Sequence, residues 1–455
     1  MARFGDREGL GISMNLNRKK LPRRGFLKKT TGVLAGLAAG GTALGYFVKP
    51  EDTGRPHTDY FSGVNETLRD AGIGLPVIIV DLDAIDHNVS RVKHYLTEPL
   101  NYRVVSKSLP SRELLSYVLD KAGTRRLMAF HQPFLEMLAG LDEKMDILLG
   151  KPLLVDSVEK FYQQVPGENK EKLSQQIQWL VDTNERLHHM LDLAKRHGIS
   201  LLVNFEIDVG LHRGGAKNTK ELDVMLRTIA ANKIYLSFTG FMGYEAHVPH
   251  APPIISSVEG AFIKAMNQYT TFFNYGRKKY PELFQGKLTF NSGGSSTYQM
   301  FPKGLPVNDI AAGSCMVKPS TFDILQDHKP ALFIAAPVIK KIGGSQLPFL
   351  DFAADLIEWW DPAMQNSIYL YGGGWAADIT SPPGIKLNGL TADPPNQNLL
   401  PNQSLYNGSN QIPIEVGDFV FFHPQQGDAI SQFQEIIVLR DRKIIDTWKS
   451  FPIKF

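Results

Sequence analysis

The sequence predicts an α/β protein in which a (β/α)8 barrel of the TIM type, over residues 76–330, is followed by a mainly β domain over residues 331–455. The first indication is a regular alternation of short apolar runs with helical patterns up to residue 330, which is typical of parallel βαβ units. About eight such units favour a closed barrel. The second indication is that this alternation stops near residue 331, where short apolar runs alternate with Gly, Pro and Asn instead. A doubly wound open sheet is the alternative, but no G-x-G-x-x-G motif follows an early strand.

Composition limits the classes of protein to which the chain can belong. At 455 residues it is long enough for two domains, and 43% hydrophobic and 21% charged residues are ordinary for a globular protein. The single cysteine, Cys315, excludes an intramolecular disulfide and a cysteine zinc cluster. Residues 1–49 contain ten Lys or Arg and two acidic residues, a net charge of +8, while the whole chain carries +3, which leaves −5 for the remainder. This mildly acidic body gives no reason to expect nucleic-acid binding.

Residues 1–49 are predicted to be a bacterial twin-arginine export signal. The motif Arg23-Arg24-Gly25-Phe26-Leu27-Lys28 follows a basic stretch and precedes a weakly apolar run rich in Gly and Ala. The alternative is an ordinary membrane anchor, but five glycines dilute the run. We therefore expect a periplasmic protein that meets the membrane only through this signal and stays anchored if the signal is not cleaved. Residues 50–75 are polar and contain Gly and Pro, and we expect them to form a linker.

Strands and helices are expected where apolar runs and helical patterns are bounded by turn residues. Residues 76–81 are predicted to be the first strand and residues 82–96 an amphipathic helix. Further strands are predicted over residues 102–107, 126–131, 145–149, 177–182, 200–206, 234–242 and 287–291, with helices over residues 184–197, 220–231 and 258–279 among the intervening segments. In the second domain, strands are expected from runs such as ALFIAAPVI and GDFVFFHP, with a short helix near residues 352–360 and a long surface loop over residues 380–412.

The stretch NYRVVSKSLP contains the most informative lysine of the chain. An apolar run over residues 102–107 ends in Lys107 and is followed by Pro110, which is typical of a buried strand with a lysine at its C-terminal mouth. Desolvation there would favour the neutral amine. A neutral amine can form a Schiff base with an aldehyde cofactor such as pyridoxal phosphate (PLP). The alternative is a lysine that extends from the strand end to the surface.

A later buried strand is predicted to end in charged residues. In LLVNFEIDVGLHRGG, Glu206 and Asp208 end the strand, and Gly210, His212 and Arg213 follow on a loop. Barrel enzymes keep their sites at this end of the strands, and an arginine there could hold a cofactor ring. A surface ion pair is the alternative.

The next strand has a similar ending. In TGFMGYEAHVPH, Tyr244, Glu245 and His247 close the strand. His247 and His250 could bind a metal ion, but their spacing on an irregular loop that contains proline is weak support for such a site.

A Gly/Ser loop follows the last predicted barrel strand. In LTFNSGGSSTY, the paired glycines Gly293 and Gly294 free backbone N–H groups, and the neighbouring hydroxyls add to an anion-binding nest. The segment Ala312-Gly313-Ser314 could add a second turn that faces the phosphate. Because a phosphate site in the last loops recurs in barrels, we expect this one to bind a cofactor phosphate rather than to be a plain loop.

In this order, the stretches resemble the fold-type III PLP enzymes with an alanine-racemase-like N-terminal barrel, especially the D-threonine aldolase and D-serine dehydratase group. The pieces that carry the resemblance are PVIIVDLDAIDHNV, the SK of Lys107, EIDVGLHRGG, GFMGYEAH, NSGGSSTY, AAGS and GDFVFFHP, over about residues 76–450. The resemblance implies that Lys107 is the Schiff-base lysine and that Arg213 and Tyr244 lie against the PLP ring. It implies a D-serine dehydratase-like β domain after residue 331. The other cofactor-binding residues that it implies are Asn291, Gly293, Gly294, Ser295, Gly313 and Ser314.

The resemblance also implies a metal site, and the chain departs from it there. The family's metal ligands are a histidine and, two residues later, a cysteine or aspartate. Here His423 is present, but Gln425 fills the second place. A neutral amide oxygen is a poor zinc ligand, so we predict that the reaction needs no tightly held zinc or manganese and that His423 acts near the substrate as a hydrogen-bonding or acid group. The alternative ligand is Asp428, with Glu206 or His247 as more distant substitutes.

These observations together predict a PLP-dependent lyase that acts at Cα of a D-amino acid, with Lys107, Tyr244 and His423 as the catalytic residues. The reaction would be loss of water and ammonia from a D-β-hydroxy amino acid, or retro-aldol cleavage. An amino-acid racemase is the second candidate, and a non-catalytic PLP-binding protein is another. The expected partners are a small amino-acid substrate and a second copy of the chain in a homodimer, without nucleic acid.

Replacement of both Arg23 and Arg24 by lysine is expected to keep the protein in the cytoplasm, because the twin-arginine route reads this pair. Cell fractionation of the variant and of the natural sequence measures the outcome. Continued export of the variant would exclude this route.

Overall fold

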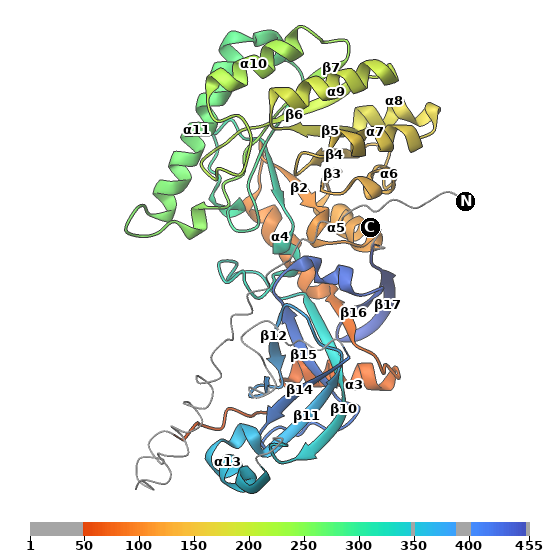
Figure 1. Cartoon of the computed structure of the whole chain (residues 1–455), viewed down its shortest axis with the longest axis vertical. Coiled ribbons are helices and arrows are strands. Elements are labelled where there is room, and N and C mark those ends of the chain that lie inside the picture. The colour runs from red at the N-terminus through yellow and green to blue at the C-terminus, as the bar shows by residue number, and fades with distance from the viewer. Residues whose placement is uncertain (1–48, 347–350, 388–401, 452–455) are drawn as a thin grey trace, which may run out of the picture.

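The computed structural model describes residues 49–346, 351–387 and 402–451. A barrel domain and a sheet domain lie end to end along the longest axis of the molecule (Figure 1). The predicted export signal lies outside the described residues, apart from Lys49. Among the described residues, no helix has the length and apolar character needed to cross a membrane.

Eight parallel strands form the closed barrel that the sequence predicts. Each strand pairs in parallel with its neighbour, and the last strand pairs with the first through Asn101 and Asp309, so the barrel is closed. The strands are β2 (Asn101–Val105), β3 (Arg126–Ala129), β4 (Asp146–Leu149), β5 (Ile177–Val181), β6 (Leu201–Glu206), β7 (Leu236–Met242), β8 (Thr289–Ser292) and β9 (Asp309–Ala312).

Helices between these strands cover the barrel, and local sequence signals set their ends. In α9, the Thr183 hydroxyl accepts the N–H of Arg186, and Gly198 ends the helix in the left-handed region at φ 63°. The predicted helices over residues 184–197 and 258–279 are confirmed. The helix predicted over residues 220–231 begins and ends one residue earlier than predicted. The barrel helices are α5 (Arg112–Ala122), α6 (Leu135–Ala139), α7 (Val155–Gln164), α8 (Gly167–Gln176), α9 (Asn184–His197), α10 (Thr219–Ala230) and α11 (Val258–Lys279).

The first predicted strand does not belong to the barrel. Strand β1 (Val77–Asp81) pairs with β10 (Leu332–Gly343) and β16 (Glu435–Arg440) in the second sheet, and helix α4 (Leu82–Tyr95) then leads to the barrel. The expected barrel boundary at residue 76 is therefore wrong. An apolar run shows that a strand is buried but not which sheet receives it. The eighth barrel strand is β9, which was not predicted; only its last residue, Ala312, belongs to the segment expected to form a second phosphate turn.

The linker expected over residues 50–75 is also wrong in part. Residues 59–70 form helix α3 (Asp59–Asp70), which buries Phe61, Val64 and Leu68. These side chains recur with a helical period and pack into one hydrophobic cluster with residues of the sheet such as Phe333 and Phe421. The segment therefore contributes to the core of the second domain.

The second domain is mainly β, as predicted. Its sheet runs in the order β13-β14-β11-β10-β1-β16-β17, and β15 pairs with both β10 and β12. A surface loop was expected over residues 380–412, but β14 within this range is a strand that pairs with β11 along its whole length. Residues 388–401 of the expected loop lie outside the described part. The short helix expected near residues 352–360 is confirmed as α13 (Ala354–Trp360). The other strands are β11 (Asn366–Tyr371), β12 (Ala377–Ser381), β13 (Lys386–Leu387), β14 (Gln403–Gly408), β15 (Phe419–Pro424) and β17 (Lys443–Lys449).

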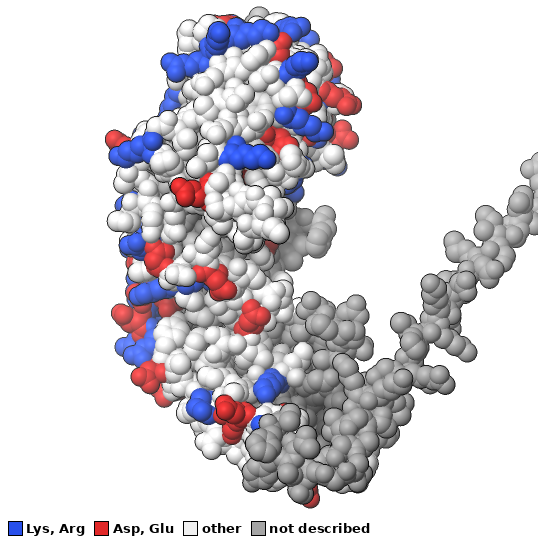
Figure 2. Space-filling view, turned by 90° about the vertical axis from the view of Figure 1, so that its left-hand side faces the viewer, with Lys and Arg blue, Asp and Glu red and all other residues white. Residues whose placement is uncertain are grey.

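Charged side chains of both signs are mixed over the barrel and the sheet domain on the face shown in Figure 2.

Candidate active site at the barrel mouth

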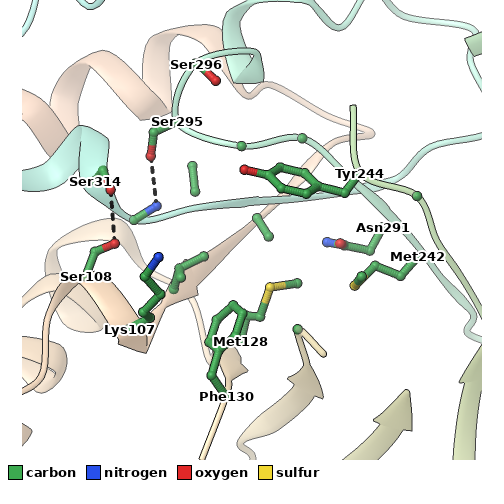
Figure 3. Close-up of a pocket in the computed structure, with 18 of the residues that line it drawn as sticks. Lys107, Ser108, Met128, Phe130, Met242, Tyr244, Asn291, Ser295, Ser296 and Ser314 are labelled. Carbon is green, nitrogen blue, oxygen red and sulfur yellow. Dashed lines mark hydrogen bonds between the residues drawn. The ribbon is translucent and has the colours of Figure 1, made fainter. Parts of the chain in front are cut away.

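A cavity of about 240 Å³ lies at the C-terminal ends of the barrel strands (Figure 3). Its walls come from the ends of β2, β3, β7, β8 and β9 and from residues that follow these strands, β4 and β6. The structure brings together in this cavity all the residues predicted to bind a cofactor. They are Lys107, Arg213, Tyr244, Asn291, Gly293, Gly294, Ser295, Gly313 and Ser314.

Lys107 lies in a single 3-10 turn, Ser106–Ser108, directly after β2. The turn is held from two sides, since the Ser106 hydroxyl donates to the carbonyl of Met128 at 3.0 Å and the Ser108 hydroxyl lies 3.1 Å from that of Ser314. The amine of Lys107 points into the cavity (Figure 3). The side chain is exposed there, so the expectation that Lys107 is desolvated is wrong.

Two loops form an anion cradle opposite Lys107. The hydroxyl of Ser295 accepts the backbone N–H groups of Gly313 and Cys315 at 3.2 and 2.9 Å, which ties the loop after β8 to the loop after β9. The backbone N–H groups of Ser295, Ser296 and Ser314 donate to no group within the described residues. Three unpaired N–H groups and several hydroxyls at one wall of a cavity fit a phosphate group.

Glu245 lies behind the first of these loops and is fully buried. Its carboxylate accepts the hydroxyl of Ser292 at 2.6 Å, the backbone N–H of Gly293 at 3.2 Å and the hydroxyl of Thr297. These bonds hold the loop in place and leave the N–H groups of Ser295 and Ser296, which line the cavity, without an acceptor among the described residues. The sequence placed Glu245 at a strand end but gave no sign of this role, because its partners follow almost fifty residues later.

Arg213 and Tyr244 form a second wall. The guanidinium of Arg213 lies 4.8 Å from the centre of the Tyr244 ring and 3.6 Å from the carboxylate of Glu206. Burial raises the pKa of Tyr244, and the charge of Glu245 adds to this effect, so Tyr244 is a neutral phenol at physiological pH. Burial likewise raises the pKa of Glu206, which the charge of Arg213 partly offsets.

The loop that carries Arg213 is shaped by Asp208. Its carboxylate accepts the backbone N–H groups of Gly210 and His212 at 2.9 and 3.0 Å, and it lies 2.7 Å from the ring of His212. His212 adopts φ 57°, a left-handed conformation that costs free energy for a residue with a side chain. Asp208 therefore holds the turn that presents Arg213 to the cavity. His247, which was considered as a metal ligand, does not line the cavity.

The structure does not bring His423 into this cavity. Its Nε2 lies 2.6 Å from the carbonyl of Lys318, and burial lowers the pKa of the ring, so the imidazole is neutral at physiological pH. The amide of Gln425 donates to Asp378 at 3.2 Å, and Asp378 pairs with His423 across β12 and β15. Sequence analysis named Asp428 as the alternative ligand and missed Asp378.

A metal site of ordinary composition is not formed by these side chains. Within the described residues, no group of three or more His, Cys, Asp or Glu side chains is placed to hold a metal ion. His423 and Asp378 offer one imidazole and one carboxylate, with Gln425 bound to the latter. These side chains therefore supply only part of the ligand set that the family's metal site would need.

Comparison with known proteins places the chain in a family. The model of the alanine racemase N-terminal domain matches residues 80–316, and the chain belongs to that family. A search of curated proteins finds no match. Membership in this family supports the expectation that the chain is a PLP enzyme of fold-type III.

Solved structures share this fold at low sequence identity. D-Threonine aldolase from Filomicrobium marinum is 14% identical with a TM-score of 0.63, covering 84% of this chain and 95% of the aldolase. D-threo-3-Hydroxyaspartate dehydratase from Delftia sp. HT23 is 14% identical with a TM-score of 0.63, covering 85% and 99% of the two chains. An alanine racemase of Clostridium difficile 630 is 15% identical with a TM-score of 0.60, covering 83% and 99%. At these identities the likeness concerns the fold.

Replacement of Glu245 by glutamine is expected to weaken PLP binding about tenfold to a hundredfold, which corresponds to the loss of a hydrogen bond to a charged group, about 1.5–3 kcal/mol. A glutamine offers a single acceptor oxygen and cannot serve all three donors of the loop. Titration of the protein with PLP, followed by visible absorbance, measures the affinity. Glu259→Gln, at an exposed position of α11, is the matched control, and an unchanged affinity for Glu245→Gln would show that the carboxylate does not hold the cradle.

Proposed function

We propose that the protein is a PLP-dependent lyase that acts at Cα of a D-amino acid, of the D-threonine aldolase or D-serine dehydratase type. One observation carries the proposal: the amine of Lys107 points into the cavity whose wall presents three free backbone N–H groups. An amine and an anion cradle in one cavity are what PLP requires, since its aldehyde and phosphate lie at different positions of one ring. The aldolase and the dehydratase with the same fold are named for substrates of the proposed kind.

The residues of the cavity have separable roles in this proposal. Lys107 would hold the cofactor covalently, and the cradle of Ser295, Ser296 and Ser314 would bind its phosphate. When bound, PLP would supply an electron sink for the bonds at Cα. The Nζ of Lys107 would accept the proton from Cα or from the β-hydroxyl group. Arg213 orients the bound molecule by its charge.

Racemisation is the second candidate, and one observation favours it. Lys107 and the neutral phenol of Tyr244 line the same cavity, so one group could remove a proton from Cα while the other returns one. An alanine racemase also shares the fold. In either case Tyr244 acts as a proton donor, because its raised pKa keeps the hydroxyl protonated.

We also propose a homodimer exported to the periplasm. The support is the resemblance of the two domains to enzymes that dimerise and the arginine pair in residues 1–49. Light scattering of the purified protein tests the dimer, and a monomer would exclude it.

PLP-loaded protein is expected to convert D-serine or D-threonine, and Lys107→Ala is expected to lose nearly all of this activity, because no other side chain of the cavity can replace the amine. A panel of D- and L-amino acids, with analysis of keto acid, aldehyde and ammonia, separates lyase products from racemisation. Lys172→Ala, at an exposed position, is the control. Turnover of the whole panel at the natural rate by Lys107→Ala would contradict the assignment of this lysine.

We expect this activity to survive treatment with a metal chelator. The reason is the neutral Gln425 in place of an anionic ligand. Elemental analysis of the PLP-loaded protein should find no stoichiometric zinc or manganese. Loss of activity on chelation, restored by either metal, would contradict this prediction and would point to His423 with Asp378 as the ligand pair.

A further inference from the structure

We propose that Gln426, on the loop that follows β15, recognises the β-hydroxyl group of the substrate and thereby selects hydroxyl-bearing D-amino acids over those without a hydroxyl. This inference rests on the proposed function and deepens it, because it names the side chain that would distinguish substrates. Gln426 would be a specificity-determining residue rather than a proton-transfer group.

Gln426 is the residue by which the second domain reaches the cavity. The other residues that line the cavity come from the barrel and from the segment that leaves it, which ends with Phe322. The amide of Gln426 makes no hydrogen bond within the described residues and is exposed at the cavity. It is therefore free to bind a ligand, in contrast to Asn291, whose amide donates to Asp309 at 2.6 Å.

The backbone around Gln426 is fixed although its side chain is free. Gln425, the preceding residue, donates its N–H to Ala376 at 2.9 Å and accepts the hydroxyl of Thr321 at 2.8 Å. Pro424 accepts the N–H of Ser320 at 3.0 Å. A side chain on a backbone held from both sides is placed accurately, as specific recognition requires.

Gly427 brings this loop against the turn that carries Lys107. A Cβ atom at Gly427 would lie 2.6 Å from the carbonyl oxygen of Ser108 and 3.1 Å from a methyl group of Val317. Glycine is therefore the residue that allows the loop to approach so closely. The contact holds Gly427 against Ser108, the residue after Lys107, and Gln426 precedes Gly427 on the same loop.

The chemistry of the cavity indicates which group Gln426 would bind. Its charged lining residues, Lys107 and Arg213, are both cations and suit the phosphate and carboxylate of the bound molecules. The neutral amide of Gln426 offers one acceptor and two donors, which matches a hydroxyl group that both donates and accepts. A site that hydrogen-bonds a substrate hydroxyl discriminates strongly against the analogue without it.

The test compares D-serine with D-alanine, which differ only by the hydroxyl. PLP-loaded natural protein, Gln426→Ala and Gln426→Met are mixed with each amino acid in a stopped-flow instrument, and the amplitude of the first change in visible absorbance of the bound PLP, before product forms, gives the apparent Kd. We expect the Kd for D-serine to rise about tenfold or more in both variants, as for the loss of one hydrogen bond, and the Kd for D-alanine to change less than about twofold. Gln432→Ala, an exposed glutamine of the same segment outside the cavity, should change neither.

An equal rise in the Kd of both amino acids, or no change in either Kd, would overturn the inference. Full preference for D-serine in Gln426→Met would also overturn it, because methionine has similar length but no hydrogen-bonding amide. If neither amino acid changes the spectrum of the natural protein, the proposed function itself fails, and the inference fails with it.

Discussion

A buried ion pair between Arg103 and Asp309 joins the first and last strands of the barrel, and the candidate site depends on it. Both side chains are fully buried, with Nε of Arg103 2.7 Å from Asp309, and Arg103 also contacts Asp146. Lys107 comes four residues after Arg103 and Gly313 four residues after Asp309, each just beyond the end of the paired strands β2 and β9. Removal of one member of a buried pair costs about 3–5 kcal/mol, so this contact fixes the amine and one cradle loop relative to each other.

The cradle depends on a negative charge, although positive charge is what a phosphate site is expected to contain. Glu245 is a buried carboxylate behind the loop after β8, where it accepts the hydroxyl of Ser292 and the N–H of Gly293. It is compensated by these donors rather than by a cation. Its effect is to order the loop before any ligand arrives, and an ordered loop loses less conformational entropy on binding. Ser295 completes the arrangement by joining this loop to the one after β9.

Sequence reasoning predicted the parts of the site that are local in the chain. Lys107 at a strand end and the paired glycines after β8 each have a signal within a few residues. It failed where distant contacts decide the structure. The buried run of β1 was assigned to the wrong sheet, β9 was missed because it is short and begins with Asp309, and helix α3 was taken for a linker.

Side-chain roles were harder to predict than elements. The histidine that the resemblance carried over, His423, lies outside the cavity and is bound to the carbonyl of Lys318, a contact across 105 residues. Gln426, which does line the cavity, has no sequence signal beyond its neighbour Gly427. Both positions depend on how the second domain packs on the barrel, and no periodicity reports that packing.

The proposed function depends most directly on Lys107 as the residue that holds PLP. Reduction of the PLP-loaded protein with borohydride fixes the cofactor to its lysine, and peptide mapping by mass spectrometry then locates it. We expect the phosphopyridoxyl group on Lys107, in about one copy per chain. A group on another lysine, or a protein that binds no reducible PLP, would contradict the account.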